Sequence, residues 1–176
     1  PNGLTLTLKQ DNTQKLTWSS VFSAETGEVI ASRAFESIQF ANGVTWTMAD
    51  IQARLLAATA GDDTIVGFTG NDSIDGGAGN DNLAGNDGDD TLLGGLGNDS
   101  LHGGNGADQL LGGADNDSIF GYTGNDTLIG GAGNDTLMGA TGDDTYRYNL
   151  GDGVDVVGDG YNLGYNSSGF DRVELG

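Results

Sequence analysis

The 176-residue sequence contains no cysteine, one proline and only six lysine or arginine residues. Without cysteine, neither a disulfide framework nor a cysteine-ligated zinc site can form. The six basic residues face 26 aspartates and glutamates, and the resulting net charge of −20 argues against binding to nucleic acid or to an anionic membrane. No apolar run approaches the roughly 18 residues of a transmembrane helix. We therefore expect no nucleic-acid partner and no membrane insertion by this chain.

Glycine, in contrast, is in excess, with 33 residues against a usual share of roughly 7%. The single proline and the absence of a G-X-Y period exclude collagen. Residues 58–147 hold 23 of the 33 glycines and 16 of the 26 acidic residues, but only one basic residue, Arg147. Such a composition predicts disorder unless something outside the protein neutralises the charge.

This block divides without a gap into ten units of nine residues. Glycine occupies the first position in nine units and the fourth position in nine units, the exceptions being Ala58 and Asp115. The sixth position is aspartate in all ten units: Asp63, Asp72, Asp81, Asp90, Asp99, Asp108, Asp117, Asp126, Asp135 and Asp144. The eighth position is always a large apolar residue: Ile65, Ile74, Leu83, Leu92, Leu101, Leu110, Ile119, Leu128, Leu137 and Tyr146.

The spacing predicts a flattened coil. The last three residues of each unit form a very short strand with one side chain turned inward, and the first six turn the chain. Glycines permit the positive φ angles that such tight turns need. Two units then complete one turn of 18 residues, and successive turns stack as parallel strands about 4.8 Å apart.

Stacking places the aspartate of one loop over that of the next, for instance Asp81 over Asp99 and Asp99 over Asp117. Carboxylates this close repel each other and resist joint burial, which a hard divalent cation between them relieves. Ligation by carboxylate and carbonyl oxygens favours calcium over magnesium or zinc. Ten loops leave four gaps on each edge, so we expect eight calcium ions, whose charge changes the formal −20 to −4.

A coil with one apolar residue in nine has little core to offset the backbone entropy lost on folding. We therefore expect the block to be unfolded without calcium and folded with it.

These units resemble the RTX, or haemolysin-type, calcium-binding nonapeptide repeat of bacterial proteins exported by type I secretion. The resemblance implies an all-β fold: a parallel β-roll, which is a right-handed β-solenoid with 18 residues per turn, closed by N- and C-terminal caps. It also implies that the position-six aspartates ligate calcium together with backbone carbonyls of the loops. The candidate carbonyl donors at positions two and four include Gly70, Gly77, Gly79, Gly88, Gly95, Gly97, Gly104, Gly106, Gly113, Gly124, Gly131, Gly133 and Gly142. Asp115 at position four and Ala58-Thr59 in the first unit depart from the pattern.

The flanks differ in composition from the repeats. Residues 4–8 and 15–18 read as strands that pair, residues 37–46 as a hairpin around Asn42-Gly43, and residues 48–58 as a short helix capped by Thr47 and Asp50. We expect Ile51 and Leu55 of this helix to cover the open first turn of the coil. The expected domains are an N-terminal flank and cap over residues 1–57, the ten repeats over residues 58–147, and a C-terminal cap over residues 148–176.

The flanks also resemble segments found between RTX blocks, residues 143–159 a closing segment and residues 169–176 a following strand. The leading hypothesis is therefore a calcium-dependent folding module of a larger secreted adhesin or toxin, located outside the cell and joined to further modules of the same chain. Two alternatives stay open: the calcium-binding part of a secreted protease or lipase, and a β-solenoid that binds sugar or ice.

No catalytic site is expected. His102, the only histidine, occupies the variable ninth position, where its side chain should face solvent. Acidic pairs such as Asp143-Asp144 recur with the repeat, which favours ligands over a glycosidase pair. Leu93, Leu111 and Ile129 recur every 18 residues and should form an outward row, either covered by a flank or used to contact a partner protein.

Overall fold

The structure is a computed structural model of the chain, and it describes residues 5–7, 15–17, 37–39, 45–158 and 170–176. The chain divides into two compact units, Pro1–Leu55 and Leu56–Gly176. No helix in the described ranges is long and apolar enough to cross a membrane.

The first unit contains two antiparallel strand pairs, as the sequence predicts. In one pair β1 (Thr5–Thr7) lies beside β2 (Lys15–Thr17), and in the other β3 (Ser37–Gln39) lies beside β4 (Thr45–Thr47). The predicted Asn42-Gly43 turn lies outside the described residues.

One short helix, α1 (Met48–Leu55), follows β4. The expected cap is present: the Asp50 backbone N–H donates to Thr47 Oγ1 (3.2 Å), and the Thr47 N–H donates to Asp50 Oδ2 (2.8 Å). The helix ends three residues before the predicted residue 58, because Ala57 is already extended and forms a parallel bridge with Asp75.

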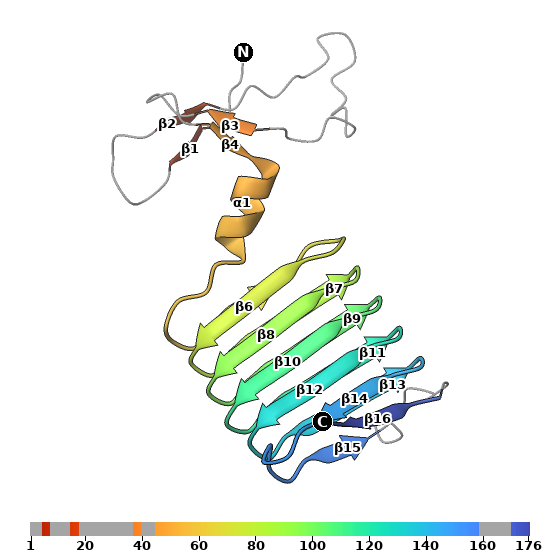
Figure 1. Ribbon diagram of the computed structural model, residues 1–176. Coiled ribbons are helices and arrows are strands. Elements are labelled where there is room, and N and C mark those ends of the chain that lie inside the picture. The colour runs from red at the N-terminus through yellow and green to blue at the C-terminus, as the bar shows by residue number, and fades with distance from the viewer. Residues whose placement is uncertain (1–4, 8–14, 18–36, 40–44, 159–169) are drawn as a thin grey trace. The chain divides into compact units, whose positions relative to one another are not determined.

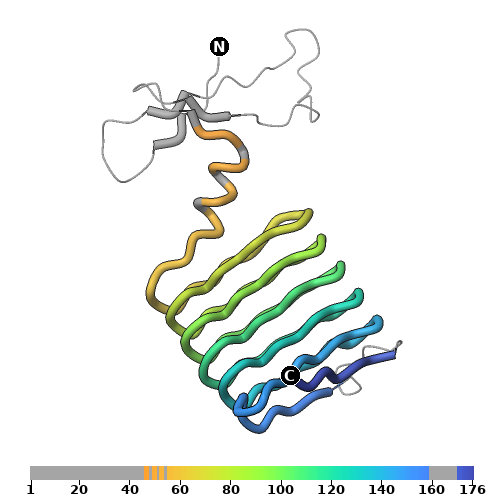
Figure 2. Tube along the Cα trace, in the orientation of Figure 1, coloured from red at the N-terminus to blue at the C-terminus, as the bar shows by residue number. Residues whose placement is uncertain are grey.

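The second unit is a parallel β-solenoid of about five turns with roughly 18 residues per turn, as predicted. Its strands alternate between two six-stranded parallel sheets, so that each turn of the coil contributes one strand to each sheet (Figure 1, Figure 2). The even-numbered sheet contains β6 (Ser73–Ala78), β8 (Thr91–Leu96), β10 (Gln109–Ala114), β12 (Thr127–Ala132), β14 (Thr145–Tyr148) and β16 (Arg172–Leu175). The odd-numbered sheet contains β5 (Thr64–Val66), β7 (Asn82–Asp87), β9 (Ser100–Asn105), β11 (Ser118–Thr123), β13 (Thr136–Thr141) and β15 (Val156–Gly158).

Most of these strands are six residues long, twice the predicted length. Each continues from positions seven to nine of one unit through positions one to three of the next, as in β8. The inward-facing residues of β8 are Leu92 at position eight and Gly94 at position one. The first glycine of each repeat is therefore part of the sheet, and only the remaining residues up to the aspartate form the turn.

The core consists of position-eight side chains in two rows, one from each sheet, which pack into a single cluster. Adjacent strands pair in a register of 18 residues, which aligns Leu92 with Leu110 and Leu110 with Leu128. The buried members are Ile65, Ile74, Leu83, Leu92, Leu101, Leu110, Ile119, Leu128, Leu137 and Tyr146. Their burial drives the stacking of the turns.

Leu56 and Ala58 are partly buried against this core at its N-terminal end. Of the two residues expected to cover the first turn, Leu55 is 63% exposed, and the side chain of Ile51 lies outside the described residues.

Candidate metal centre

The position-six aspartates form two columns, each held by the backbone of the neighbouring turn. The Asp81 N–H donates to Asp99 Oδ1 at 2.8 Å, and the same bond between residues 18 apart recurs in all eight pairs from Asp63–Asp81 to Asp126–Asp144, at 2.7 to 2.9 Å. The predicted stacking of these side chains is therefore present.

The second carboxylate oxygen of the interior aspartates is buried and has no hydrogen-bond partner. This holds for Oδ2 of seven consecutive position-six residues, each no more than 3% exposed: Asp81, Asp90, Asp99, Asp108, Asp117, Asp126 and Asp135. A buried anionic oxygen without a partner is strongly unfavourable. Seven in regular succession indicate a ligand that the protein itself does not supply.

The first glycine of each unit makes room for this oxygen. A Cβ added to Gly94 would lie 2.4 Å from Asp99 Oδ2 and 2.5 Å from the carbonyl oxygen of Gly112. The same overlap with the aspartate of the same unit occurs at Gly76, Gly85, Gly103, Gly112, Gly121, Gly130 and Gly139. The absence of a side chain at position one therefore leaves space around a carboxylate oxygen and a carbonyl oxygen together.

The glycines at positions two and four bring further carbonyl oxygens to the same edge. A Cβ added to Gly95 would lie 2.1 Å from the Gly77 carbonyl oxygen, and one added to Gly97 would lie 2.1 Å from that of Gly79. Every glycine proposed as a carbonyl donor from the sequence has a positive φ: Gly70, Gly77, Gly79, Gly88, Gly95, Gly97, Gly104, Gly106, Gly113, Gly124, Gly131, Gly133 and Gly142. This backbone conformation favours glycine over residues with side chains, and it stacks the loops closely.

Burial makes the interior carboxylates poor anions in the metal-free protein. It raises the pKa of Asp108 to about 6 and the pKa values of Asp117 and Asp126 to about 7. Desolvation is the main cause; the hydrogen bond from the preceding loop opposes it, and repulsion between stacked aspartates reinforces it. A cation at this edge offsets both the desolvation of the carboxylates and the repulsion between them.

The donor set is made of oxygen alone. In the described part of the chain no group of three or more histidine, cysteine, aspartate or glutamate residues is placed to hold a metal by side chains alone. Carboxylate oxygens in pairs, supplemented by several backbone carbonyls, are typical of calcium sites. The residues present therefore fit calcium, which when bound supplies the positive charge that the buried aspartates lack.

Comparison with known families agrees with this geometry. The model of the RTX calcium-binding nonapeptide repeat matches four times, at residues 55–83, 84–119, 111–146 and 120–157, and so covers more than half of the chain. The chain belongs to the RTX calcium-binding repeat family. No individual curated protein matches it significantly.

The first two RTX units differ from the rest. Asp63 Oδ2 accepts hydrogen bonds from the Thr59 N–H (2.6 Å) and the Thr59 hydroxyl (2.9 Å), and Asp72 Oδ2 accepts one from the Phe68 N–H (2.7 Å). Thr59 and Phe68 stand at position two of their units, where later units mostly have glycine. In these two loops the aspartate therefore caps its own turn.

In the later units, residues that replace the consensus glycines adopt a positive φ, as the glycines at positions two and four do. Asp115, which replaces the fourth glycine of its unit, has φ 75°, and Tyr122 and Ala140 at position two have φ 76° and 77°. A Cβ added to Gly133 would lie 1.8 Å from the Asp115 carbonyl oxygen, so this carbonyl keeps the position that glycine carbonyls have elsewhere. The seventh unit retains the loop shape with a strained residue.

Side chains at position five are also stacked between turns, although the sequence pattern did not predict hydrogen bonds between them. Asn98 Oδ1 accepts the Asn116 N–H (3.1 Å), and Asn116 Oδ1 accepts the Asn134 N–H (2.9 Å). Nine of the ten RTX units have asparagine or aspartate here, Ala107 being the exception. This bias was the available signal for an exposed polar ladder that runs beside the buried aspartates.

The stacking of aspartates continues beyond residue 147, where the period of nine did not predict it. Asp155 Oδ1 accepts the Asp135 N–H (3.0 Å), and Asp171 Oδ1 accepts the Asp144 N–H (3.1 Å). Next to these aspartates β15 pairs with β13, with Val156 opposite Thr136, and β16 pairs with β14, with Arg172 opposite Thr145. The signal was the spacing of Gly151, Gly153 and Asp155, which repeats positions two, four and six after an insertion of two residues that interrupts the period of nine.

His102 lies on the outer face of the odd-numbered sheet but is only partly exposed. Its ring stacks on Phe120 with 5.2 Å between ring centroids, its Nε2 lies 3.0 Å from Ser100 Oγ, and its Nδ1 lies 3.0 Å from Tyr122 Oη. Desolvation lowers the pKa of His102. The side chain is therefore held in a small polar and aromatic cluster.

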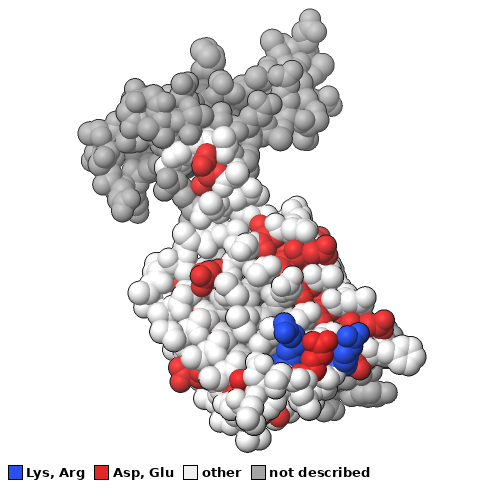
Figure 3. Space-filling view, in the orientation of Figure 1, with Lys and Arg blue, Asp and Glu red and all other residues white. Residues whose placement is uncertain are grey.

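The predicted apolar row is in register on the even-numbered sheet: Leu93 pairs with Leu111, and Leu111 with Ile129. All three side chains are partly exposed. The row is bounded by Asp75 at one end and Arg147 at the other. The outer face of this sheet is otherwise mostly uncharged in Figure 3, apart from the acidic and basic side chains near the C-terminal strands.

Proposed function

We propose that the chain is a calcium-dependent folding and structural module of a larger secreted protein, such as an adhesin or a toxin, with eight calcium ions between the ten repeats. The observation that carries the proposal is the succession of buried carboxylate oxygens without partners from Asp81 to Asp135. A single such oxygen can be tolerated as a local defect, but a regular column of them in a chain of net charge −20 requires counter-charge at each turn.

The secreted location is proposed because a module of this kind gains its fold only where calcium is abundant. In the proposed cycle the chain is unfolded at cytosolic calcium and folds outside the cell, since metal binding contributes directly to the free energy of folding.

Circular dichroism of the full chain in chelator, followed by titration with calcium, tests the proposal. The strand signal is expected to be largely absent in chelator and to rise cooperatively with calcium, and magnesium at the same concentration is expected to be ineffective. A strand signal that is the same with and without chelator would contradict it.

We also propose that the row formed by Leu93, Leu111 and Ile129 contacts another module or partner protein. Partly exposed leucine and isoleucine side chains aligned on adjacent strands favour this role, because removing such an apolar row from water is energetically favourable. Surface labelling of the calcium-loaded chain, compared with that of the longer protein, is expected to show protection of this row only in the longer protein.

A further inference from the structure

The loop after β14 reproduces the shape of a repeat loop although the insertion of two residues breaks the sequence period. Gly151 and Gly153 have φ 103° and 123°, and they stand four and two residues before Asp155, as positions two and four do before position six. Among the described glycines outside the ten repeats, only these two have a positive φ.

The loop is also stacked like a repeat loop. The Gly133 N–H donates to the Asp152 carbonyl (2.6 Å), which matches the bond from the Gly79 N–H to the Leu96 carbonyl (2.9 Å) in the interior. Gly133 and Gly153 form a parallel bridge, and a Cβ added to Gly153 would lie 1.6 Å from the Gly133 carbonyl oxygen. The backbone of residues 152–155 therefore continues the edge of the roll by one further loop.

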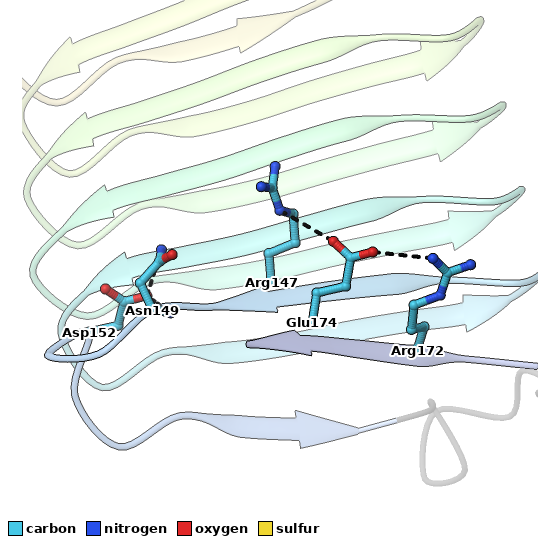
Figure 4. A network of polar contacts seen from close by, with 5 residues as sticks. All are labelled: Arg147, Asn149, Asp152, Arg172 and Glu174. Carbon is cyan, nitrogen blue, oxygen red and sulfur yellow. Dashed lines mark hydrogen bonds and ion pairs between the residues drawn. The ribbon is translucent and has the colours of Figure 1, made fainter. Parts of the chain in front are cut away.

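This loop faces a carboxylate that has an unused oxygen. Asp135 is 1% exposed, its N–H donates to Asp155 Oδ1, and its own Oδ2 has no partner. Asp152 is engaged differently: its Oδ2 accepts the Asn149 N–H (2.6 Å) and an amide N–H of the Asn149 side chain (3.2 Å), as Figure 4 shows. Of the two acidic residues in the loop, Asp155 is thus the one placed as a repeat aspartate.

The edge ends at this loop. The hydroxyl of Tyr148 donates to the carbonyl of Gly153. Gly153 corresponds to position four of a repeat, and in an interior loop the carbonyl at this position faces the next turn, as that of Gly79 faces Gly97. At the same C-terminal end of the even-numbered sheet, Glu174 forms ion pairs with Arg147 (Nε–Oε2, 3.6 Å) and Arg172 (Nη1–Oε1, 3.2 Å) (Figure 4). A tyrosine hydroxyl therefore occupies the oxygen that a further ion on this edge would need.

We propose that a ninth calcium ion binds between the loops 130–135 and 150–155, with Asp135 and Asp155 as carboxylate ligands and the carbonyls of Gly131 and Gly133 as further donors. The ion fastens β15 to β13. The inference rests on the proposed calcium function and extends it beyond the repeats. A Cβ added to Gly151 would meet nothing within 4 Å, so this gap is more open than the interior gaps, and the ninth site fills last in a titration.

The test uses the full chain and Asp155→Asn, which removes the charge but keeps an amide oxygen that accepts the Asp135 N–H. Native mass spectrometry at saturating calcium is expected to count one ion fewer in this variant than in the wild type. Hydrogen exchange is expected to be faster by at least 10-fold at residues 156–158 and unchanged in β9. Asp89→Asn is the matched control, because it removes one charge at position five, where other repeats have asparagine, and it is expected to keep the full count.

An unchanged ion count in Asp155→Asn, or an equal loss in Asp89→Asn, would overturn the ninth site. Asp99→Asn separates this failure from failure of the proposed function: it should lower the count by acting on interior sites even if Asp155→Asn does not. If the wild-type chain binds no calcium at all, the proposed function fails and the ninth site with it.

Discussion

The first two repeats and the eight that follow share the same aspartate but use it in different ways. In the first two loops Oδ2 of that aspartate accepts a hydrogen bond from the backbone N–H at position two of its own unit: Asp63 binds Thr59, and Asp72 binds Phe68. From Asp81 to Asp135 the second oxygen is buried without a partner. The contrast shows that the repeat consensus alone does not determine whether a loop needs a cation.

The difference follows from where the loop lies in the stack. At the first turn no preceding loop presents an N–H to the aspartate of that turn, so the side chain is free to rotate onto its own backbone and form a turn cap. In the interior, Oδ1 is committed to the turn before, as in the bond from the Asp81 N–H to Asp99 Oδ1. The other oxygen then has only the gap between loops, and this is where positive charge is required.

The largest effect is expected from adding a methyl group at position four. In Gly97→Ala the new Cβ lies 2.1 Å from the Gly79 carbonyl oxygen at a φ of +114°, whereas in Gly61→Ala, at the same position of the first unit, it meets nothing within 4 Å. Strain and overlap together should cost Gly97→Ala on the order of 3 kcal/mol or more. Calcium titrations followed by circular dichroism should show failed or strongly shifted folding for Gly97→Ala and a nearly unchanged curve for Gly61→Ala.

Removal of single aspartates comes next in size. Asp99→Ala deletes a carboxylate shared by two gaps and should raise the calcium midpoint at least about 10-fold. Asp63→Ala deletes a turn cap worth about 1 kcal/mol and should shift the midpoint only a few-fold. Isothermal titration calorimetry on both variants measures the difference, and equal shifts at the centre and at the end would contradict the distinction between the two kinds of loop.

Acid is expected to replace calcium in part. Burial raises the pKa of Asp117 and Asp126 to about 7 in the folded, metal-free state, against roughly 3.9 in an unfolded chain. Protonation of these groups therefore favours the folded state; the contribution is fully present below about pH 4 and is lost as the pH rises through about 7.

In chelator, circular dichroism should show more strand at pH 5 than at pH 8. In calcium, the midpoint should rise as the pH falls from 8 to 6, because protons compete for the same oxygens. The double variant Asp117→Asn/Asp126→Asn serves as the control, and its strand signal in chelator should depend less on pH. Metal-free strand content that decreases on acidification would show that the interior carboxylates are not the groups that oppose folding.

The solenoid was predictable from the sequence because its period is strict. The 18-residue register, the two sheets and the apolar core from Ile65 to Tyr146 all follow from one inward apolar residue and one turn in every nine residues. The strand length was not predictable in the same way. Glycine at position one disfavours a strand by propensity, yet Gly94 lies in β8 because the residues on either side of it, Leu93 and Gly95, pair with the adjacent strands.

Two features of the site depend on the place of a loop in the stack, which a linear period does not contain. The N–H groups of Thr59 and Phe68 donate to Asp63 and Asp72 because these aspartates lie in the first turn, where no preceding loop binds their carboxylates. Asp155 is displaced by an insertion of two residues, which hides it from a search in steps of nine while the three-dimensional stack restores its register.

The smallest effect should come from repairing the one unit that lacks its fourth glycine. Asp115 has a φ of 75°, and its charge contributes to raising the pKa values of both Asp99 and Asp117. Asp115→Gly removes strain and repulsion together, so the calcium-loaded chain should gain about 1 kcal/mol in thermal or denaturant unfolding. Asp115→Asn removes the charge but keeps a side chain that tolerates this φ, and it should give only part of the gain. If the two variants are equally stable, repulsion rather than backbone strain is what distinguishes the seventh unit, and the loop shape itself imposes no measurable penalty on a non-glycine residue.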